Sequence, residues 1–471
     1  MTHTIGMISL GCAKNQVNAE QMLYLLRQAG YEILPDPDGA ELVIINTCGF
    51  IDSAKEEAID HILAMGALKQ EGRVGKILVT GCLAQRYQEE IVNEMPEVDG
   101  VLGTGSYYDI VHAAKEILDG KKYERFDDIS APLNEPGRIL TTPEQYAYLK
   151  IAEGCDNYCA FCIIPKLRGH YRSQKMEELI AEAKTLAEDG VKELIVVAQD
   201  TSRYGEDLYG ARKLPELLRQ LCKIDGFHWI RVHYLYPEAI SEELIDVFAT
   251  EPKLVKYFDI PFQHINDEIL KKMNRHTDGA YIRKLVTHLR ERVPGAVFRT
   301  SLITGLPGEG EAEFEELCEF LKEYKLERVG AFVFSPEEGT RAAEMEYPDT
   351  EIARERAERV AELQSRIMDE YNERCLGETM EALCEGYDPD EGSYFGRTYA
   401  DSPDVDGKIW FTSEQHVKTG DFVRVRIVDT YDGELVAIAE DDIDDDGEEN
   451  YIGPGGSDPG VYGATALQRR E

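Results

Sequence analysis

Three cysteines stand close together in the chain at a spacing that suits a metal-binding loop. Cys155, Cys159 and Cys162 follow the pattern Cys-x3-Cys-x2-Cys, after a strand predicted over 146–151 and before a helix predicted from Lys175. Thiolates at this spacing can bind three irons of a four-iron, four-sulfur cluster, which normally takes four cysteines, so the fourth iron stays open to a substrate. The alternatives are a zinc loop or three ordinary buried thiols. Zinc sites usually combine two Cys-x2-Cys pairs, and no second pair follows at the usual distance.

The same loop resembles the signature of the radical S-adenosylmethionine (SAM) enzymes. In that family the open iron chelates the amino and carboxylate groups of SAM, and an electron from the cluster cleaves SAM to a 5′-deoxyadenosyl radical. The resemblance implies that Cys155, Cys159 and Cys162 are catalytic cluster ligands and that SAM is a cofactor.

Three more cysteines follow predicted strands in the first third of the chain. Cys12, Cys48 and Cys82 each stand beside a glycine, within a few residues of the end of an apolar run. These runs alternate with helical patterns, which predicts a parallel α/β sheet. Because ligands gather at the carboxyl ends of parallel strands, the three thiols should meet at one edge and could hold a second cluster with an open iron. The alternative is three small buried residues in tight turns, since cysteine packs well.

The motifs around these cysteines resemble the N-terminal domain of the methylthiotransferases, which are radical SAM enzymes with two iron–sulfur clusters. They run from Ser9 to Glu20, from Asn46 to Ile51 and from Thr80 to Leu83. Asn18 and Ala19 replace the Asp-Ser that is usual in the family, but neither position carries a thiolate. Within the family, the chain most resembles the branch that methylthiolates the β-carbon of an aspartate in small-subunit ribosomal protein S-twelve. The nearest alternative is the branch that methylthiolates adenosine in transfer RNA.

This resemblance implies two [4Fe-4S] clusters and a division of labour between them. SAM would be the radical source and the methyl donor, and an external electron donor and an external sulfur donor would be needed. The C–H bond of the aspartate β-carbon is unactivated, so the reaction needs a radical that only a cofactor can supply. An alternative from another functional class is an iron–sulfur carrier. It would explain Cys12, Cys48 and Cys82 but not the second cysteine loop at Cys155, Cys159 and Cys162.

A repeated strand–helix pattern predicts a partial (β/α)6 barrel like that of the radical SAM enzymes, with its active site at the carboxyl ends of the strands. The predicted strands are 146–151, 193–197, 229–232, 257–260, 297–302 and 328–334. The resemblance implies that residues after these strands contact SAM. Phe161 matches an adenine contact, Gln199 and Asp200 match the segment that binds the methionyl amino group, and Ile303 and Gly305 lie in a segment whose glycines admit a flat adenine. Packing in the core is the alternative for Phe161.

Two arginines follow the cysteine loop. Arg168 or Arg172 could anchor a carboxylate, either from SAM or from the target aspartate. The alternative for both is ion pairing on a surface loop.

The end of the chain changes to short strands with turn signals, and it resembles the small β-barrel called TRAM that ends methylthiotransferases. We expect strands at 380–384, 396–398, 422–427 and 435–439, after a helix over 350–375. Between residues 378 and 440 there are fifteen acidic residues and five basic ones. Such a module repels an RNA backbone and attracts a basic protein, so we expect a protein substrate and no stable binding of nucleic acid.

The totals agree with this interpretation. The chain has 471 residues, a net charge of −39 and ten cysteines, too few for a disulfide framework at this length. The charge favours a basic partner, although solubility or a saline habitat would also explain it. No apolar run is long enough to span a membrane and no signal peptide precedes the first strand, so we expect a cytoplasmic protein without membrane contact. The predicted parts are an N-terminal methylthiotransferase domain over 1–126, a linker over 127–143, a radical SAM domain over 144–375, a TRAM domain over 376–440 and an acidic disordered tail over 441–471.

Overall fold

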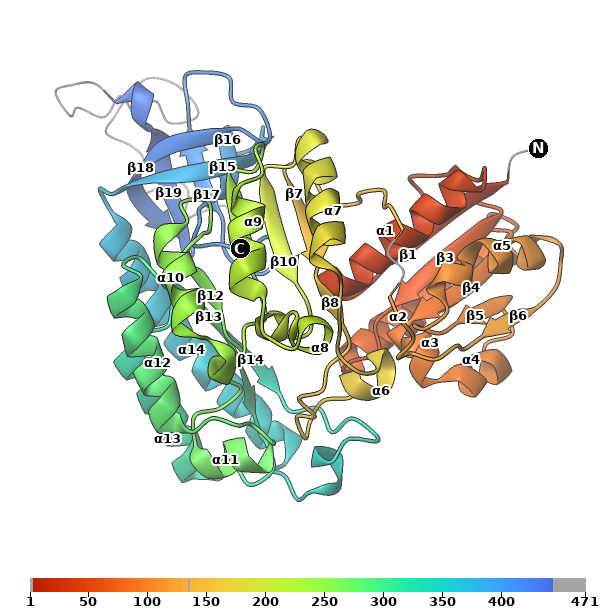
Figure 1. Cartoon of the computed structure of the whole chain (residues 1–471), viewed down its shortest axis with the longest axis horizontal. Coiled ribbons are helices and arrows are strands. Elements are labelled where there is room, and N and C mark those ends of the chain that lie inside the picture. The colour runs from red at the N-terminus through yellow and green to blue at the C-terminus, as the bar shows by residue number, and fades with distance from the viewer. Residues whose placement is uncertain (1–2, 134–135, 444–471) are drawn as a thin grey trace.

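The computed structural model describes residues 3–133 and 136–443, so most of the predicted tail lies outside the described residues. Figure 1 shows three parts: an α/β sheet domain at the N-terminal end, a partial barrel in the middle and a small β-barrel at the C-terminal end. None of the described helices has the length and the apolar character needed to cross a membrane.

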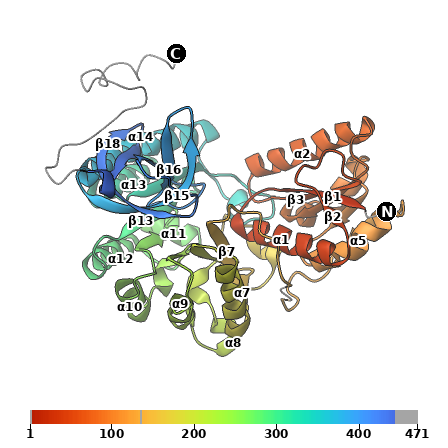
Figure 2. The same ribbon diagram turned by 90° about the horizontal axis from the view of Figure 1, so that it is seen from above.

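The first part is a parallel sheet of six strands in the order β2-β1-β3-β4-β5-β6, as the alternating pattern predicts. Helices α1 and α5 cover one face, and α2, α3 and α4 cover the other, so the domain has three layers (Figure 2). Every residue of β3 is buried because it lies between these layers. The strands are β1 Thr4–Ser9, β2 Glu32–Ile33, β3 Leu42–Thr47, β4 Lys76–Gly81, β5 Gly100–Leu102 and β6 Tyr123–Arg125. The helices are α1 Ala13–Gln28, α2 Asp52–Gln70, α3 Cys82–Arg86, α4 Gln88–Glu94 and α5 Ile110–Leu118, with a 3-10 turn at Tyr107–Asp109.

The middle part has six parallel strands in two sheets, β7-β10-β11 and β12-β13-β14, with helices outside them (Figure 1). Apolar side chains between strands and helices form one continuous core. The strands are β7 Tyr146–Lys150, β10 Glu193–Val197, β11 Trp229–Val232, β12 Tyr257–Asp259, β13 Val297–Thr304 and β14 Arg328–Val333, and a small antiparallel pair adds β8 Ala152–Glu153 and β9 Arg172–Ser173. The helices are α6 Ile164–Arg168, α7 Met176–Glu188, α8 Glu206–Tyr209, α9 Leu214–Cys222, α10 Glu242–Thr250, α11 Asp267–Lys272, α12 Gly279–Arg292, α13 Glu311–Tyr324 and α14 Thr350–Cys375, with 3-10 turns at Thr201–Arg203, Pro237–Ala239 and Ala342–Glu344.

The last part is a closed barrel with the strand order β15-β16-β17-β19-β18. Strand β17 is additional to the four strands that the turn signals predict, and it pairs in parallel with β19 and antiparallel with β16 to close the barrel. The strands are β15 Thr379–Asp388, β16 Ser393–Arg397, β17 Ile409–Thr412, β18 Phe422–Tyr431 and β19 Glu434–Ala439, followed by a 3-10 turn at Glu440–Asp442.

The small barrel packs against the amino-terminal ends of the middle strands. Trp229, Tyr257 and Val297, which begin β11, β12 and β13, form one apolar cluster with Leu383 and Phe422 of the small barrel. The active edge of such a barrel is at the carboxyl ends of its strands, so the small barrel sits at the opposite end.

A loop of the small barrel also reaches into the middle part. In this loop, residues 398–408, the Asp406 carboxylate accepts a hydrogen bond from the Tyr257 hydroxyl over 2.6 Å. The Arg328 guanidinium donates to Asp401 over 2.7 Å. These buried polar contacts fix the small barrel relative to the middle part.

Candidate iron–sulfur and cofactor site

The loop of Cys155, Cys159 and Cys162, here called the loop trio, lies between β8 and α6, at the carboxyl end of the first barrel strand. Backbone bonds hold it on both sides: the Cys155 N–H donates to the Gly169 carbonyl over 3.1 Å, and the Ala160 N–H donates to the Met273 carbonyl over 3.0 Å. A Cβ on Gly154 would lie 2.1 Å from the carbonyl oxygen of His170, and its φ is +81°. Only glycine therefore lets the loop enter beside the returning chain.

The three thiols of the loop trio share one environment. Cys155 and Cys159 are buried and Cys162 is half-buried. Burial raises the pKa of Cys155 to about 12, and the Cys159 thiol adds to the rise. Burial, and then Cys159, also raise the pKa of Cys162. Thiols that influence one another in this way lie close together, and they need a nearby cation or metal to become thiolates.

Two side chains that the sequence analysis missed approach Cys159. The Tyr236 hydroxyl lies 3.3 Å from its Sγ, and the Arg275 guanidinium donates toward the same sulfur over 3.6 Å. Arg275 is buried and stands 4.4 Å from the centroid of the Tyr236 ring. A buried cation at this position favours a thiolate, or a cluster of negative charge, over a neutral thiol.

Cys12, Cys48 and Cys82, here called the sheet trio, lie at the carboxyl ends of β1, β3 and β4. The structure brings them together at one edge of the sheet. A Cβ on Gly11, whose φ is +89°, would lie 3.1 Å from the Cys48 Sγ, so the glycine permits this approach. Burial raises the pKa of Cys48 to about 11, and Cys82 and Cys12 add to the rise.

Arg168 connects the two trios. It ends α6, directly after the loop trio, and its Nε donates to the Cys82 Sγ over 3.3 Å. The same guanidinium donates to the side-chain oxygens of Asn18 over 2.7 Å and Asn15 over 2.8 Å, both on α1. Arg168 is buried, so the structure does not support the alternative of ion pairing on a surface loop.

Arg168 also pairs with Glu153, the residue that precedes the loop trio by one glycine. Its Nη1 lies 3.4 Å from the Glu153 carboxylate, and the Lys150 ammonium lies 3.2 Å from the same oxygen. Burial alone would raise the pKa of Glu153, but Arg168 and Lys150 lower it to about 2. Glu153 is therefore ionised at neutral pH and holds Arg168 between the trios.

An apolar cluster completes this junction. Cys82 packs with Ile163 and Leu167, which follow the loop trio, and with Phe50, which follows Cys48. Ion pairs dock the two domains nearby: the buried Glu337 carboxylate pairs with Lys55 of α2 at 3.0 Å and with Arg86 of α3 at 2.5 Å. The two trios therefore face one interface between the N-terminal domain and the partial barrel.

The residues expected to contact SAM lie around the loop trio. Phe161 and Ile303 pack against the same apolar cluster, next to Ala160. The Gln199 amide donates to Glu153 over 2.6 Å, and the Asp200 carboxylate accepts from the Asn157 amide, inside the loop, over 2.8 Å. Their roles as cofactor contacts remain predictions.

Gly305 admits a close approach, but the approaching group is part of the chain. A Cβ at Gly305 would lie 2.4 Å from the Cβ of Ala353 on α14, and the φ of Gly305 is +79°. Packing of α14 therefore explains this glycine, and a contact with adenine stays a prediction.

The donor set of each trio has the chemistry of an iron–sulfur site. Within residues 3–133 and 136–443, no three histidine, cysteine or carboxylate side chains are arranged around one metal ion. A four-iron cluster carries each thiolate on a different iron, so its ligands stand around a larger body. Each trio offers three soft thiolate donors, the type that such clusters require.

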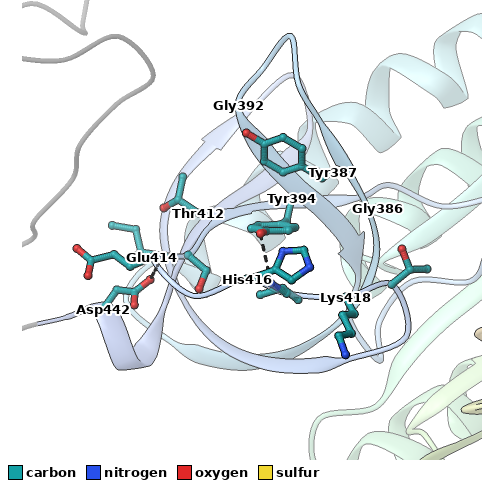
Figure 3. A pocket seen from close by; sticks show the side chains of 13 residues that line it. Gly386, Tyr387, Gly392, Tyr394, Thr412, Glu414, His416, Lys418 and Asp442 are labelled. Carbon is teal, nitrogen blue, oxygen red and sulfur yellow. Dashed lines mark hydrogen bonds between the residues drawn. The ribbon is translucent and has the colours of Figure 1, made fainter.

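A pocket of about 750 Å³ lies elsewhere, inside the small barrel (Figure 3). The side chains of Tyr387, Tyr394, His416 and Lys418 line it. It belongs to the end of the molecule opposite the trios, so it is not the site of the thiol chemistry.

Comparison with known proteins agrees with this three-part arrangement. Residues 4–103 match the uncharacterized protein family UPF0004, residues 149–321 match the radical SAM superfamily, and residues 376–439 match the TRAM domain. Two structures of the radical SAM methyltransferase TsrM from Kitasatospora setae share the fold at 14% identity. Their TM-scores are 0.51 and 0.50, and the matches cover 70% and 73% of this chain and 73% and 74% of theirs. The protein is thus a radical SAM enzyme, a class that implies a [4Fe-4S] cluster and SAM.

Curated relatives narrow this class to one family. The ribosomal protein uS12 methylthiotransferase RimO of Thermoanaerobacter sp. is 46% identical over 92% of this chain and 99% of its own length. The RimO proteins of Caldanaerobacter subterraneus and Lachnoclostridium phytofermentans are 48% and 47% identical, again over 92% of this chain and 99% of theirs. The chain belongs to the RimO family of methylthiotransferases, as the motifs predict.

Proposed function

We propose that this enzyme methylthiolates the β-carbon of an aspartate side chain in ribosomal protein uS12, the protein that its relatives are named for. The observation that carries the proposal is the joining of the two thiol trios by Arg168, which ends the loop segment and donates to Cys82. A reaction that combines radical formation with sulfur insertion needs two such sites at one interface, and an iron–sulfur carrier does not.

In this proposal Cys155, Cys159 and Cys162 hold the cluster that supplies the electron for cleavage of SAM. Arg275 and Tyr236 compensate the negative charge of Cys159. The neighbouring groups would bind the cofactor: Phe161 and Ile303 would provide apolar surface for adenine, Gly305 would lie in the same segment as Ile303, and Gln199 and Asp200 would be available to the methionyl ammonium.

The sheet trio has the second role. Cys12, Cys48 and Cys82 hold a second [4Fe-4S] cluster that supplies the site for the added sulfur. Arg168 orients Cys82, and its amide partners on α1 fix the guanidinium. Electrons and sulfur come from donors outside the chain.

The TRAM barrel supports a protein substrate. Of its five basic residues, Arg397 is buried and paired with Glu193 at 2.7 Å, and Arg424 pairs with Glu440 at 2.7 Å. Each pair engages an acid as well as a base, so the module keeps the excess of acids that fifteen acidic and five basic residues give it. Such a surface attracts the basic chain of a ribosomal protein, whereas phosphate binding to transfer RNA needs free cations. A ribosomal substrate places the reaction in the cytoplasm.

Mass spectrometry of the products tests the proposal. Anaerobically reconstituted enzyme is incubated with SAM, a reductant, sulfide and either uS12 or transfer RNA, with Cys155→Ala as the inactive control. We expect a methylthio group on one aspartate of uS12 and none on the RNA. Modified adenosine without modified uS12 would assign the enzyme to the other branch.

A further inference from the structure

Most cations at the junction of the two trios already have anionic or thiol partners within the chain. Arg168 donates to Cys82 and pairs with Glu153, and Lys55 and Arg86 share Glu337. Arg275 donates to Cys159 and to a backbone carbonyl. Because these cations already have partners, none of them is a simple binding site for the carboxylate of a substrate. The contacts of Arg168 therefore do not favour the expectation that it anchors such a carboxylate.

Lys14 differs from these cations. It lies in the first turn of α1, two residues after Cys12, and only 8% of its surface is exposed. Its ammonium crosses the domain interface and stands 3.6 Å from the ring centroid of Tyr234. No ion pair among residues 3–133 and 136–443 joins Lys14 to a carboxylate within salt-bridge distance; Tyr234 is its direct contact, and Cys12 and Asp259 act on its charge from further away. A buried ammonium without a directly paired carboxylate is costly, and an aromatic face compensates only part of that cost.

Tyr234 is itself held in an unusual conformation. It follows β11 at the carboxyl edge of the barrel, its φ is +60°, and its N–H donates to the Asp259 carboxylate over 3.0 Å. A non-glycine residue rarely takes this conformation, and such residues concentrate at functional sites. Two residues further on, Tyr236 contacts Cys159 of the loop trio. Lys14 therefore lies at the interface between the sheet trio and the barrel edge that carries the loop trio.

We infer that Lys14 binds the carboxylate of the target aspartate and selects aspartate over its amide. The inference rests on the proposed function and names the group that recognises the substrate. An ammonium forms short, charge-assisted hydrogen bonds with a carboxylate. In aspartate the carboxyl carbon is bonded directly to the β-carbon, so a fixed carboxylate also fixes the C–H bond that reacts. Lys14 is thus a binding and positioning residue.

A competing role for Lys14 is to balance the charge of the neighbouring Cys12. In that case the loss of the ammonium would change the iron site of the sheet trio and leave the choice of substrate unchanged. The two roles therefore predict different measurements.

A cycle of two enzymes and two peptides separates them. Reconstituted wild type and Lys14→Met are mixed with a fluorescent peptide that spans the modified loop of uS12, with aspartate or asparagine at the target position. Methionine retains the length of the side chain and its packing on Tyr234. Kd is measured by anisotropy, and product by mass spectrometry. Lys55→Met is the matched control, because it removes an interface lysine that already has a carboxylate partner. Iron content and the electron paramagnetic resonance spectrum are recorded for each variant.

We expect wild type to bind the aspartate peptide on the order of ten-fold more tightly than the asparagine peptide, and Lys14→Met to bind the two alike. Lys55→Met and Lys14→Arg should keep the preference, since both retain the cation at position 14. A preference that persists in Lys14→Met overturns the inference. Loss of iron from Lys14→Met also overturns it, by assigning the ammonium to Cys12. If wild type does not modify uS12 at all, the proposed function fails first, and that outcome is visible without any variant.

Discussion

The two thiol trios differ in how the chain builds them and in how open they are. The loop trio comes from eight consecutive residues, with two cysteines buried and one half-buried. The sheet trio comes from three strands, and its members range from exposed Cys12 through half-buried Cys48 to buried Cys82. The loop trio is therefore the more enclosed of the two, which suits the radical step that we propose for it, and exposed Cys12 gives the sheet trio an open side.

Each trio nevertheless has one buried arginine on one of its cysteines. Arg275 donates toward Cys159, and Arg168 donates toward Cys82. Arg168 contacts the sheet trio but belongs to the segment that follows the loop trio. Arg275 contacts the loop trio and belongs to the same domain as that trio. The sheet trio thus takes part of its charge compensation from the partial barrel, through Arg168, whereas the arginine on Cys159 comes from the same domain as the loop trio.

The largest expected effect comes from removing one thiol of the loop trio. Cys155→Ala should reduce 5′-deoxyadenosine formation below detection and abolish methylthiolation, because both outputs depend on this site. Chromatography of the SAM products measures the first output, and mass spectrometry of uS12 measures the second. Cys222→Ala, which changes a cysteine in the core of α9, is the control. Normal SAM cleavage by Cys155→Ala would refute its role as a ligand.

The second prediction removes one thiol of the sheet trio. Cys48→Ala should keep SAM cleavage within about three-fold of wild type and form no methylthio product, since all three thiols of the loop trio and Arg275 remain in place. The same two assays are used. Loss of cleavage in this variant as well would show that the trios do not divide the labour.

A weaker effect is expected from loosening the interface between the trios. Glu337→Gln removes the buried charge that pairs with Lys55 and Arg86, and loss of one partner of a buried pair costs roughly 3–5 kcal/mol. We expect SAM cleavage to continue while the yield of product per 5′-deoxyadenosine falls several-fold. Glu319→Gln, on the exposed face of α13, should leave this ratio unchanged. If Glu337→Gln forms as much product per 5′-deoxyadenosine as wild type, the docking of the two domains does not control how SAM cleavage is coupled to methylthiolation.

The smallest predicted difference is between the alkylation rates of two cysteines. In metal-free protein, the surrounding chain partly desolvates the Cys12 thiol, which would raise its pKa even though the residue is exposed, but Lys14 and Arg168 lower that pKa. Burial raises the pKa of Cys155 to about 12. Only thiolates react with iodoacetamide, so near neutral pH exposed Cys12 should be alkylated before Cys155. Peptide mapping over a time course measures the order. Equal alkylation rates for Cys12 and Cys155 would contradict the difference that we describe between the surroundings of these two thiols.

The sequence predicts the elements of both trios but not what surrounds them. The loop trio is contiguous, and the strand-end rule locates Cys12, Cys48 and Cys82 at one edge of the sheet. All six barrel strands and the helix over 350–375 also follow from periodicity. Strands β5 and β6, of three residues each, carry too little pattern to be recognised.

The surrounding charges could not be predicted because they depend on tertiary packing. Arg275 stands 116 residues from Cys159, and no local pattern links the two. Lys14 lies within a recognised motif, but its burial and its contact with Tyr234 exist only once two domains meet. The sequence did carry a signal in Lys150 and Glu153, two charged residues in an otherwise uncharged run that ends one glycine before the loop trio.

Iron counting with Mössbauer spectroscopy tests the central claim most directly. Wild type and two triple variants, one with alanine at each cysteine of the loop trio and one with alanine at each cysteine of the sheet trio, are reconstituted without oxygen. We expect about eight irons in wild type and about four in each variant. Four irons or fewer in wild type, or eight in either variant, would contradict the existence of two separate clusters on these thiols.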